Sequence, residues 1–155
     1  PYVRGALAHA HAVGSRTAIV ASTPIPPDLK VDVAILPIVG PEVITGSTRM
    51  KAGTATKLVL NTITTGAMIR MGKTYGNLMV DLRATNAKLA ARSERIVAEV
   101  CGISREEARE VLGAAGGGVK VAIVMRKRGV DRAEAEQLLT DANGVLRDII
   151  GPPPA

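Results

Sequence analysis

The stretch Gly40–Lys57 gathers most of the side chains in this sequence that could carry out chemistry. It combines a single carboxylate, from Glu42, with three cations and several hydroxyls, and its glycines allow a ligand close to the backbone. The cations are Arg49, Lys51 and Lys57, and the central hydroxyls are Ser47 and Thr48. This combination predicts a site for a small anion. The alternative is a helix cap whose charges are simply solvated.

An apolar helix is predicted directly after this stretch. Leu58–Ile69 contains no charged residue, and small and apolar positions keep helical spacing from Ala52 to Met71. The first amides of such a helix favour an anion. Because the opposite face also lacks charges, we expect this helix to be covered all round, by a sheet and a second layer or by another subunit.

The elements before the stretch predict an α/β fold. Residues 2–13 have a helical stripe, and two short apolar runs, 17–21 and 33–38, have the length and composition of buried strands. The proline-rich segment 22–28 can only connect them. Alternating helices and strands indicate a parallel sheet, in which ligands gather at the carboxyl ends of the strands. Gly40 follows the second strand at that end.

The remainder of the chain reads as helical. We place a domain boundary after Asp81 and expect helices over 82–101, 106–115 and from about 131 to 149, with Ser104–Glu107 as a capping box. Residues 119–125 could be strand or helix, and we favour helix. The predicted domains are 1–81, a small helical domain over 82–150, and a disordered proline-rich tail over 151–155.

Composition excludes several classes of function. The formal charge of +6 would suit nucleic acid, but two tyrosines are the only aromatic residues, so base stacking is nearly unavailable and we expect no nucleic-acid partner. No segment is apolar enough to span a membrane. His9 and His11 point to different helix faces without further ligands, so we expect no metal. The single cysteine, Cys101, predicts a buried thiol in a reducing, cytoplasmic setting.

Gly40–Lys57 resembles, almost position for position, the motif shared by bacterial N-acetylmuramic acid 6-phosphate etherases and the animal glucokinase regulatory protein. That motif is Gly-Pro-Glu, a hydrophobic pair, then Gly-Ser-Ser/Thr-Arg-Met-Lys-Ala-Gly-Thr-Ala and Lys. The similarity continues through Leu58–Asn61, Tyr75–Asp81 and Ala84–Leu89, and it takes in the opening helix and the helical tail. Essentially the whole chain is covered.

The resemblance implies the second half of a SIS (sugar isomerase) domain, a doubly wound parallel-sheet α/β sandwich that binds phosphosugars, followed by a small all-α C-terminal domain. In this family the first half supplies the phosphate-binding loop and the glutamates assigned as catalytic acid and base. None of those maps onto this sequence, which opens on Pro1 without an initiator Met. We therefore expect an incomplete fragment that is inactive alone.

The implied reaction cleaves the D-lactyl ether of N-acetylmuramic acid 6-phosphate by elimination followed by water addition, which yields N-acetylglucosamine 6-phosphate and D-lactate. No residue is assigned here as certainly catalytic. Glu42 either lies at the sugar, binding hydroxyls or assisting proton transfer, or makes a structural hydrogen bond to the loop. The other expected substrate-binding residues are Ser47, Thr48, Arg49 and Lys51, whereas Lys57 either adds charge or faces outward.

The resemblance also sets the expected partners. It implies a phosphosugar substrate, a homodimer and no cofactor, in a lyase of cell-wall (peptidoglycan) recycling and amino sugar catabolism. The alternative is a non-catalytic regulatory protein of the glucokinase-regulator type, which binds a phosphosugar and contacts a kinase. That regulator has two SIS units and a longer chain.

Overall fold

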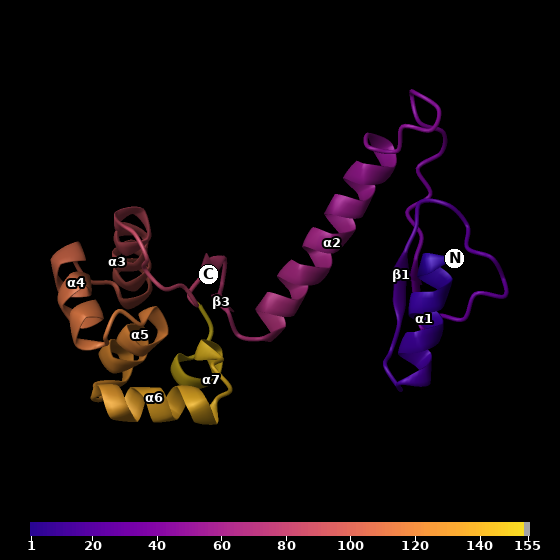
Figure 1. The fold of residues 1–155 in the computed structure, drawn as a ribbon. Helices are drawn as coiled ribbons and strands as arrows, with labels where there is room; N and C mark the ends of the chain where they lie inside the picture. Colours follow the sequence, from indigo (N-terminus) through magenta and orange to yellow (C-terminus); the bar gives the residue numbers. More distant parts are fainter. Residues whose placement is uncertain (154–155) are drawn as a thin grey trace. The chain divides into compact units, whose positions relative to one another are not determined.

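A computed structural model describes residues 1–153 of the chain (Figure 1). The chain divides after Thr65 into two compact units, and this division falls inside a helix, well before the boundary that we predicted after Asp81. Helices and short strands occur together, so the chain has a mixed α/β composition, with helices predominating.

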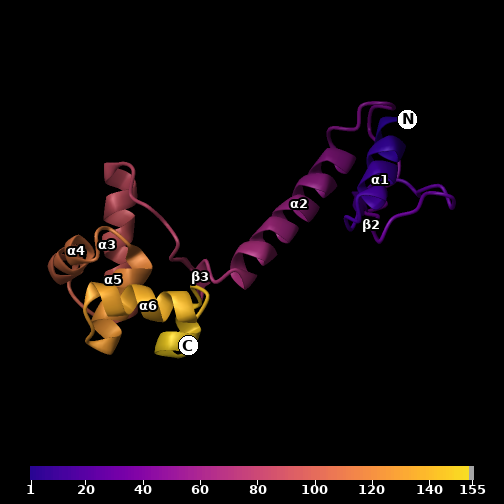
Figure 2. The same ribbon diagram turned by 60° about the horizontal axis from the view of Figure 1, so that its bottom comes forward.

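The first unit begins with a helix and a parallel pair of strands. Helix α1 covers Tyr2–Ala12, and strands β1 (Ala18–Val20) and β2 (Val33–Ile35) pair in parallel with Ile19 opposite Ala34. Both strands and their parallel pairing were predicted. Figures 1 and 2 show α1 running alongside this pair.

A carboxylate fastens the two strands together where they begin. Asp32 Oδ2 accepts hydrogen bonds from the backbone N–H of Thr17 at 2.6 Å and from its hydroxyl at 2.9 Å. His11 Nε2 lies 3.3 Å from the same hydroxyl. These bonds lower the pKa of Asp32, and the imidazole of His11 joins α1 to the strands. Thr17 is buried, and it is the only buried residue among residues 1–65.

Helix α2 covers Lys51–Arg70 and has no buried residue. Its large apolar side chains stay open to solvent within this chain: Leu58 is 61% exposed and Ile63 is 47% exposed. The expectation that this helix is covered all round is not met within residues 1–153. Cover by another subunit, the other alternative, stays a prediction.

After the end of α2, the second unit continues with a short β-hairpin. Strands β3 (Thr74–Tyr75) and β4 (Leu78–Met79) pair antiparallel, and Gly76 takes a positive φ of 59° in the two-residue turn between them. The Tyr75 hydroxyl donates to the carbonyl of Gly151 at 3.2 Å. This contact ties the hairpin to the end of the described chain, in the segment that composition assigned to a disordered tail. Pro154 and Ala155 of that tail lie outside the described residues.

Five helices complete the second unit: α3 (Ala87–Cys101), α4 (Arg105–Ala114), α5 (Val119–Arg128), α6 (Arg132–Asp141) and α7 (Leu146–Ile150). The capping box of Ser104 and Glu107 is confirmed, with N–H to oxygen distances of 2.8 and 3.1 Å, and so is the helix over 119–125. The single long helix predicted up to Ile149 is wrong. Asn143 (φ 50°) and Gly144 (φ 75°) adopt left-handed conformations that end it and start α7.

The hydrophobic core lies wholly in this second unit. Every buried apolar residue that the structure describes falls between Tyr75 and Leu146, and α5 packs at the centre of the helices (Figure 1). The fully buried side chains include Val80, Ile96, Ile123 and Leu146. Cys101 packs against this core, and burial raises the pKa of its thiol, which fits the structural role that we predicted.

Candidate functional site

The candidate loop runs from Gly40 to Met50, between β2 and α2 (Figure 1). Gly40 and Gly46 both adopt left-handed conformations, with φ of 70° and 83°, and the N–H of Ser47 donates to the carbonyl of Ile44 at 3.0 Å. The loop is therefore turned twice by glycines. It lies beyond the carboxyl end of a parallel strand, as the sequence predicted.

The carboxylate of Glu42 binds the first turn of α2. One oxygen accepts the N–H of Lys51 and the other accepts the N–H of Ala52, each at 3.0 Å. A helix leaves its first four N–H groups without helical partners, and here Glu42 satisfies two of them. The N–H of Gly53 donates to the carbonyl of Thr48 at 2.9 Å, and that of Thr54 donates to Met50 at 3.0 Å.

These bonds have two consequences for the expected anion site. All of the first-turn amides of α2 are engaged inside the chain, so the negative charge at this helix end is the carboxylate of Glu42 itself. The amides of Ala52 and Lys51, in that order, lower the pKa of Glu42, because they stabilise its ionised form. A carboxylate with a lowered pKa and both oxygens engaged is a poor proton acceptor at neutral pH.

Lys51 closes the loop from the other side. Its ammonium Nζ donates to the carbonyl of Pro41 at 2.9 Å, beside Glu42, so Lys51 is held by backbone and carboxylate together. The sequence predicted Lys51 as a substrate-binding residue. In this structure its ammonium group contacts the start of its own loop, at Pro41.

The other predicted residues lie in the loop itself or on α2. Thr48 and Arg49 are exposed and Ser47 is half-buried, and Arg49 has no ion-pair partner within residues 1–153. The guanidinium of Arg49 is therefore open to an anion that offers two oxygens, such as a carboxylate or phosphate. Lys57 is exposed on the body of α2, in agreement with the outward-facing alternative.

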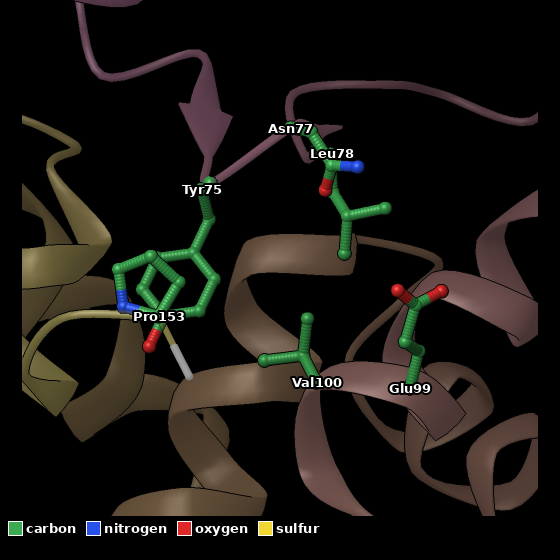
Figure 3. Close-up of a pocket in the computed structure, with 7 residues that line it drawn as sticks. Tyr75, Asn77, Leu78, Glu99, Val100 and Pro153 are labelled. Atoms are coloured by element: carbon green, nitrogen blue, oxygen red, sulfur yellow. The ribbon is translucent and has the colours of Figure 1, made fainter. Parts of the chain in front are cut away.

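The second unit contains a cavity that sequence reasoning missed. It encloses about 370 Å³ and is lined by Tyr75, Gly76, Asn77, Leu78, Glu99, Val100 and Pro153 (Figure 3). The walls are mostly apolar, and burial raises the pKa of Tyr75, whose hydroxyl is already bonded to Gly151. The only sequence signal near this cavity was the pair Gly76-Asn77, because such a pair marks the turn of a β-hairpin. The cavity offers an apolar surface and one carboxylate.

The described residues restrict other kinds of chemistry. Among residues 1–153, no three His, Cys, Asp or Glu side chains are grouped so that they could hold a metal ion. No helix within the same range combines the length and apolarity needed to cross a membrane. The side-chain groups of the candidate loop that stay open are hydroxyls and a guanidinium.

The sequence of this chain is similar to those of known proteins. A sequence profile of the C-terminal lid domain of glucokinase regulatory protein matches residues 76–116. The chain is 52% identical over 151 residues to the N-acetylmuramic acid 6-phosphate etherase of Photobacterium profundum, covering 97% of this chain and 50% of that protein. It is 49% identical over 156 residues to the etherase of the same name from Rhodopirellula baltica, covering 99% of this chain and 51% of that protein.

These matches agree with one another. A third relative, the N-acetylmuramic acid 6-phosphate etherase of Vibrio vulnificus, is 52% identical over 95% of this chain and 49% of its own length. The chain spans about half the length of the curated relatives it matches. Over nearly its whole length, this chain is thus similar in sequence to about half of each of these N-acetylmuramic acid 6-phosphate etherases.

Proposed function

We propose that this chain forms part of an N-acetylmuramic acid 6-phosphate etherase. Such a lyase cleaves the D-lactyl ether of N-acetylmuramic acid 6-phosphate to N-acetylglucosamine 6-phosphate and D-lactate, by elimination and then hydration. The observation that carries the proposal is about 50% identity, sustained over 95% or more of this chain, to several etherases. The activity belongs to amino sugar catabolism, in the recycling of peptidoglycan, and we propose a cytoplasmic location.

The proposed architecture is the second half of a SIS-type doubly wound sandwich followed by a helical lid. The parallel pair β1–β2 followed by α2 has the connectivity of such a sheet. Exposed apolar side chains on the strands and on α2, such as Val33, Leu58 and Ile63, support a covering layer supplied by the remainder of an etherase. A homodimer interface would cover a further part of the same surface.

In this proposal the candidate loop recognises the anionic groups of the substrate. N-acetylmuramic acid 6-phosphate carries a phosphate and a lactyl carboxylate, and either one suits bidentate binding by Arg49. The hydroxyls of Ser47 and Thr48 can donate to an anion or to a sugar hydroxyl. The base that removes the proton α to the aldehyde of the open-chain sugar, and the acid that helps lactate leave, are provided by the half of the etherase that this chain does not span.

A chimera tests this function directly. This chain would replace the matched 151 residues of the Photobacterium profundum etherase, and D-lactate release from N-acetylmuramic acid 6-phosphate would be measured. We expect activity from the chimera and none from the 155-residue chain alone. A folded chimera that releases no D-lactate, while the parent etherase does, would show that the proposed function is wrong.

Substitutions in the chimera test the loop. Arg49→Ala should raise the KM for the sugar phosphate by about 10- to 100-fold, the effect of losing one charge-assisted bidentate contact. Lys57→Ala is the matched control, because it removes an exposed positive charge from the body of α2. Equal KM values for the two variants would remove Arg49 from the site.

A second candidate function is favoured by one observation. The lid profile that matches residues 76–116 describes glucokinase regulatory protein. A regulator of that type would bind a phosphosugar and contact a kinase without turnover. Phosphosugar binding by the chimera without D-lactate release, under conditions in which the parent etherase turns over, would favour this alternative.

A further inference from the structure

We propose that Glu42 is a positioning residue of the candidate loop, and that it does not carry the proton in the reaction. The inference rests on the proposed etherase function and assigns a role to one residue within it. The two carboxylate oxygens of Glu42 accept hydrogen bonds from different amides of α2, one from the N–H of Lys51 and the other from the N–H of Ala52.

Glu42 lies near the start of the candidate loop, and its carboxylate binds the helix that follows the loop. Residues 43–50 are therefore closed into a ring by the bonds of Glu42 to Lys51 and Ala52. The Lys51 ammonium adds a second closure through the carbonyl of Pro41. The conformation of the loop therefore depends on contacts made at its two ends.

Ser47, Thr48 and Arg49 all lie within the ring that these two closures form. Exposed apolar neighbours such as Val43, 80% exposed, give the loop little packing of its own. The backbone of Thr48 is held directly, because its carbonyl accepts the N–H of Gly53 at the same helix end. Releasing Glu42 would thus loosen the residues that present hydroxyls and the guanidinium.

The carboxylate lies at the positive end of α2, whose first turn contains no other acidic residue. Two amide donors and the helix end stabilise its ionised form and lower its pKa, so it remains an anion through neutral pH. A general base has to exchange its proton near the working pH and needs a free oxygen directed at the substrate. Glu42 meets neither condition in this structure.

The first test uses NMR of the etherase chimera to measure the hydrogen bonds of Glu42 to the first turn of α2. The carboxyl carbon of Glu42 and the amides of Lys51 and Ala52 should titrate together, with a midpoint below the ordinary glutamate value of about 4.3. In Glu42→Gln the amide titration should vanish. Asp28→Asn is the control, because it removes an exposed carboxylate of the same unit that pairs with Arg4 instead of a helix end. Amides that do not respond to Glu42 would overturn the proposal.

The second test separates positioning from proton transfer in the chimera. Loss of a cap should raise the KM of Glu42→Gln by about tenfold and leave kcat within a few-fold, whereas loss of a general base lowers kcat by about 10²–10⁴-fold. The fall of kcat/KM at acidic pH should persist in the variant. A large loss of kcat, together with the disappearance of this fall at acidic pH, would overturn the positioning role.

The outcomes also separate this inference from the proposed function. If the chimera is active and Glu42→Gln changes neither KM nor kcat, the positioning role is wrong and the etherase function stands. If the folded chimera itself releases no D-lactate, the proposed function fails, and the positioning role in that reaction fails with it. Because Glu42→Ala could disturb the helix end more widely, Glu42→Asp is the second variant, and it should recover part of the lost affinity.

Discussion

Gly72 lies directly against the carbonyl oxygen of Gly144, so that a Cβ atom at position 72 would come within 2.9 Å of that oxygen and within 2.9 Å of Val145 Cγ2. Gly72 also has a φ of 67°, which L side chains rarely adopt. We predict that Gly72→Ala destabilises the second unit by about 2–4 kcal/mol, from the left-handed conformation and the overpacking together. Urea unfolding followed by circular dichroism would measure this loss.

Gly129→Ala is the matched control for that measurement. Gly129 has nearly the same φ, 68°, but its Cβ would meet nothing within 4 Å. It should therefore cost only the conformational part, about 1 kcal/mol. Equal losses for the two variants would show that the contact between Gly72 and Gly144 can relax freely.

Asp81 gives a prediction about pH. The ammonium of Lys73 donates to Asp81 at 2.7 Å, and this bond is the largest cause that lowers the pKa of the carboxyl. A group whose pKa is lower in the folded state stabilises fully above its unfolded pKa, about 3.9, and loses that effect as pH falls through the folded value.

The change Asp81→Asn should therefore destabilise the chain at pH 7 by about 0.5–1 kcal/mol, a modest value because the side chain is partly exposed. The difference from wild type should shrink as pH falls from about 5 to about 2, since Asp81 is then protonated in both states. Unfolding curves at several pH values would follow it. A difference that stays constant with pH would contradict the ionic origin.

Much of the helical unit could be predicted because its signals are local. The capping box at Ser104 and Glu107 spans three residues, and strong helical neighbours decided the ambiguous run 119–125 in favour of helix. The break at Asn143 was missed although Asn-Gly is a turn signal. The apolar residues on both sides of Asn143 keep the same helical spacing. This longer pattern concealed the left-handed conformations of Asn143 and Gly144.

The candidate site was predicted as a location but not as an arrangement. Residue types identified the loop, since glycines and charges cluster between a strand and a helix. The sequence left two alternatives for Glu42, a position at the sugar or a structural hydrogen bond. It could not identify the bonded amides, because they lie nine and ten residues later, outside the spacing of a capping box. Periodicity likewise showed that α2 is apolar, but it does not show what packs against its apolar surface.

The uneven distribution of buried residues predicts unequal stability of the two parts. All described buried apolar residues lie between Tyr75 and Leu146, so residues 72–155 should fold alone with a cooperative urea transition. Residues 1–71 should give a poorly dispersed NMR spectrum, because they bury no apolar side chain of their own. A cooperative transition in the isolated 1–71 fragment would contradict this expectation.

A pair of truncations compares the core with the open helix. Ile123 is 0% exposed in α5, whereas Leu58 is 61% exposed in α2. In the 155-residue chain, Ile123→Ala should cost about 2–5 kcal/mol and Leu58→Ala less than about 0.5 kcal/mol in urea unfolding.

The same pair in the etherase chimera tests the proposed covering layer. If the remainder of the etherase packs over α2, Leu58 becomes buried, and Leu58→Ala should then cost about 2–4 kcal/mol. Ile123→Ala serves as the internal reference, since its surroundings belong to the helical unit in both proteins. A cost for Leu58→Ala that stays below about 0.5 kcal/mol in the chimera would mean that α2 faces solvent there too, and the proposed sandwich would be wrong.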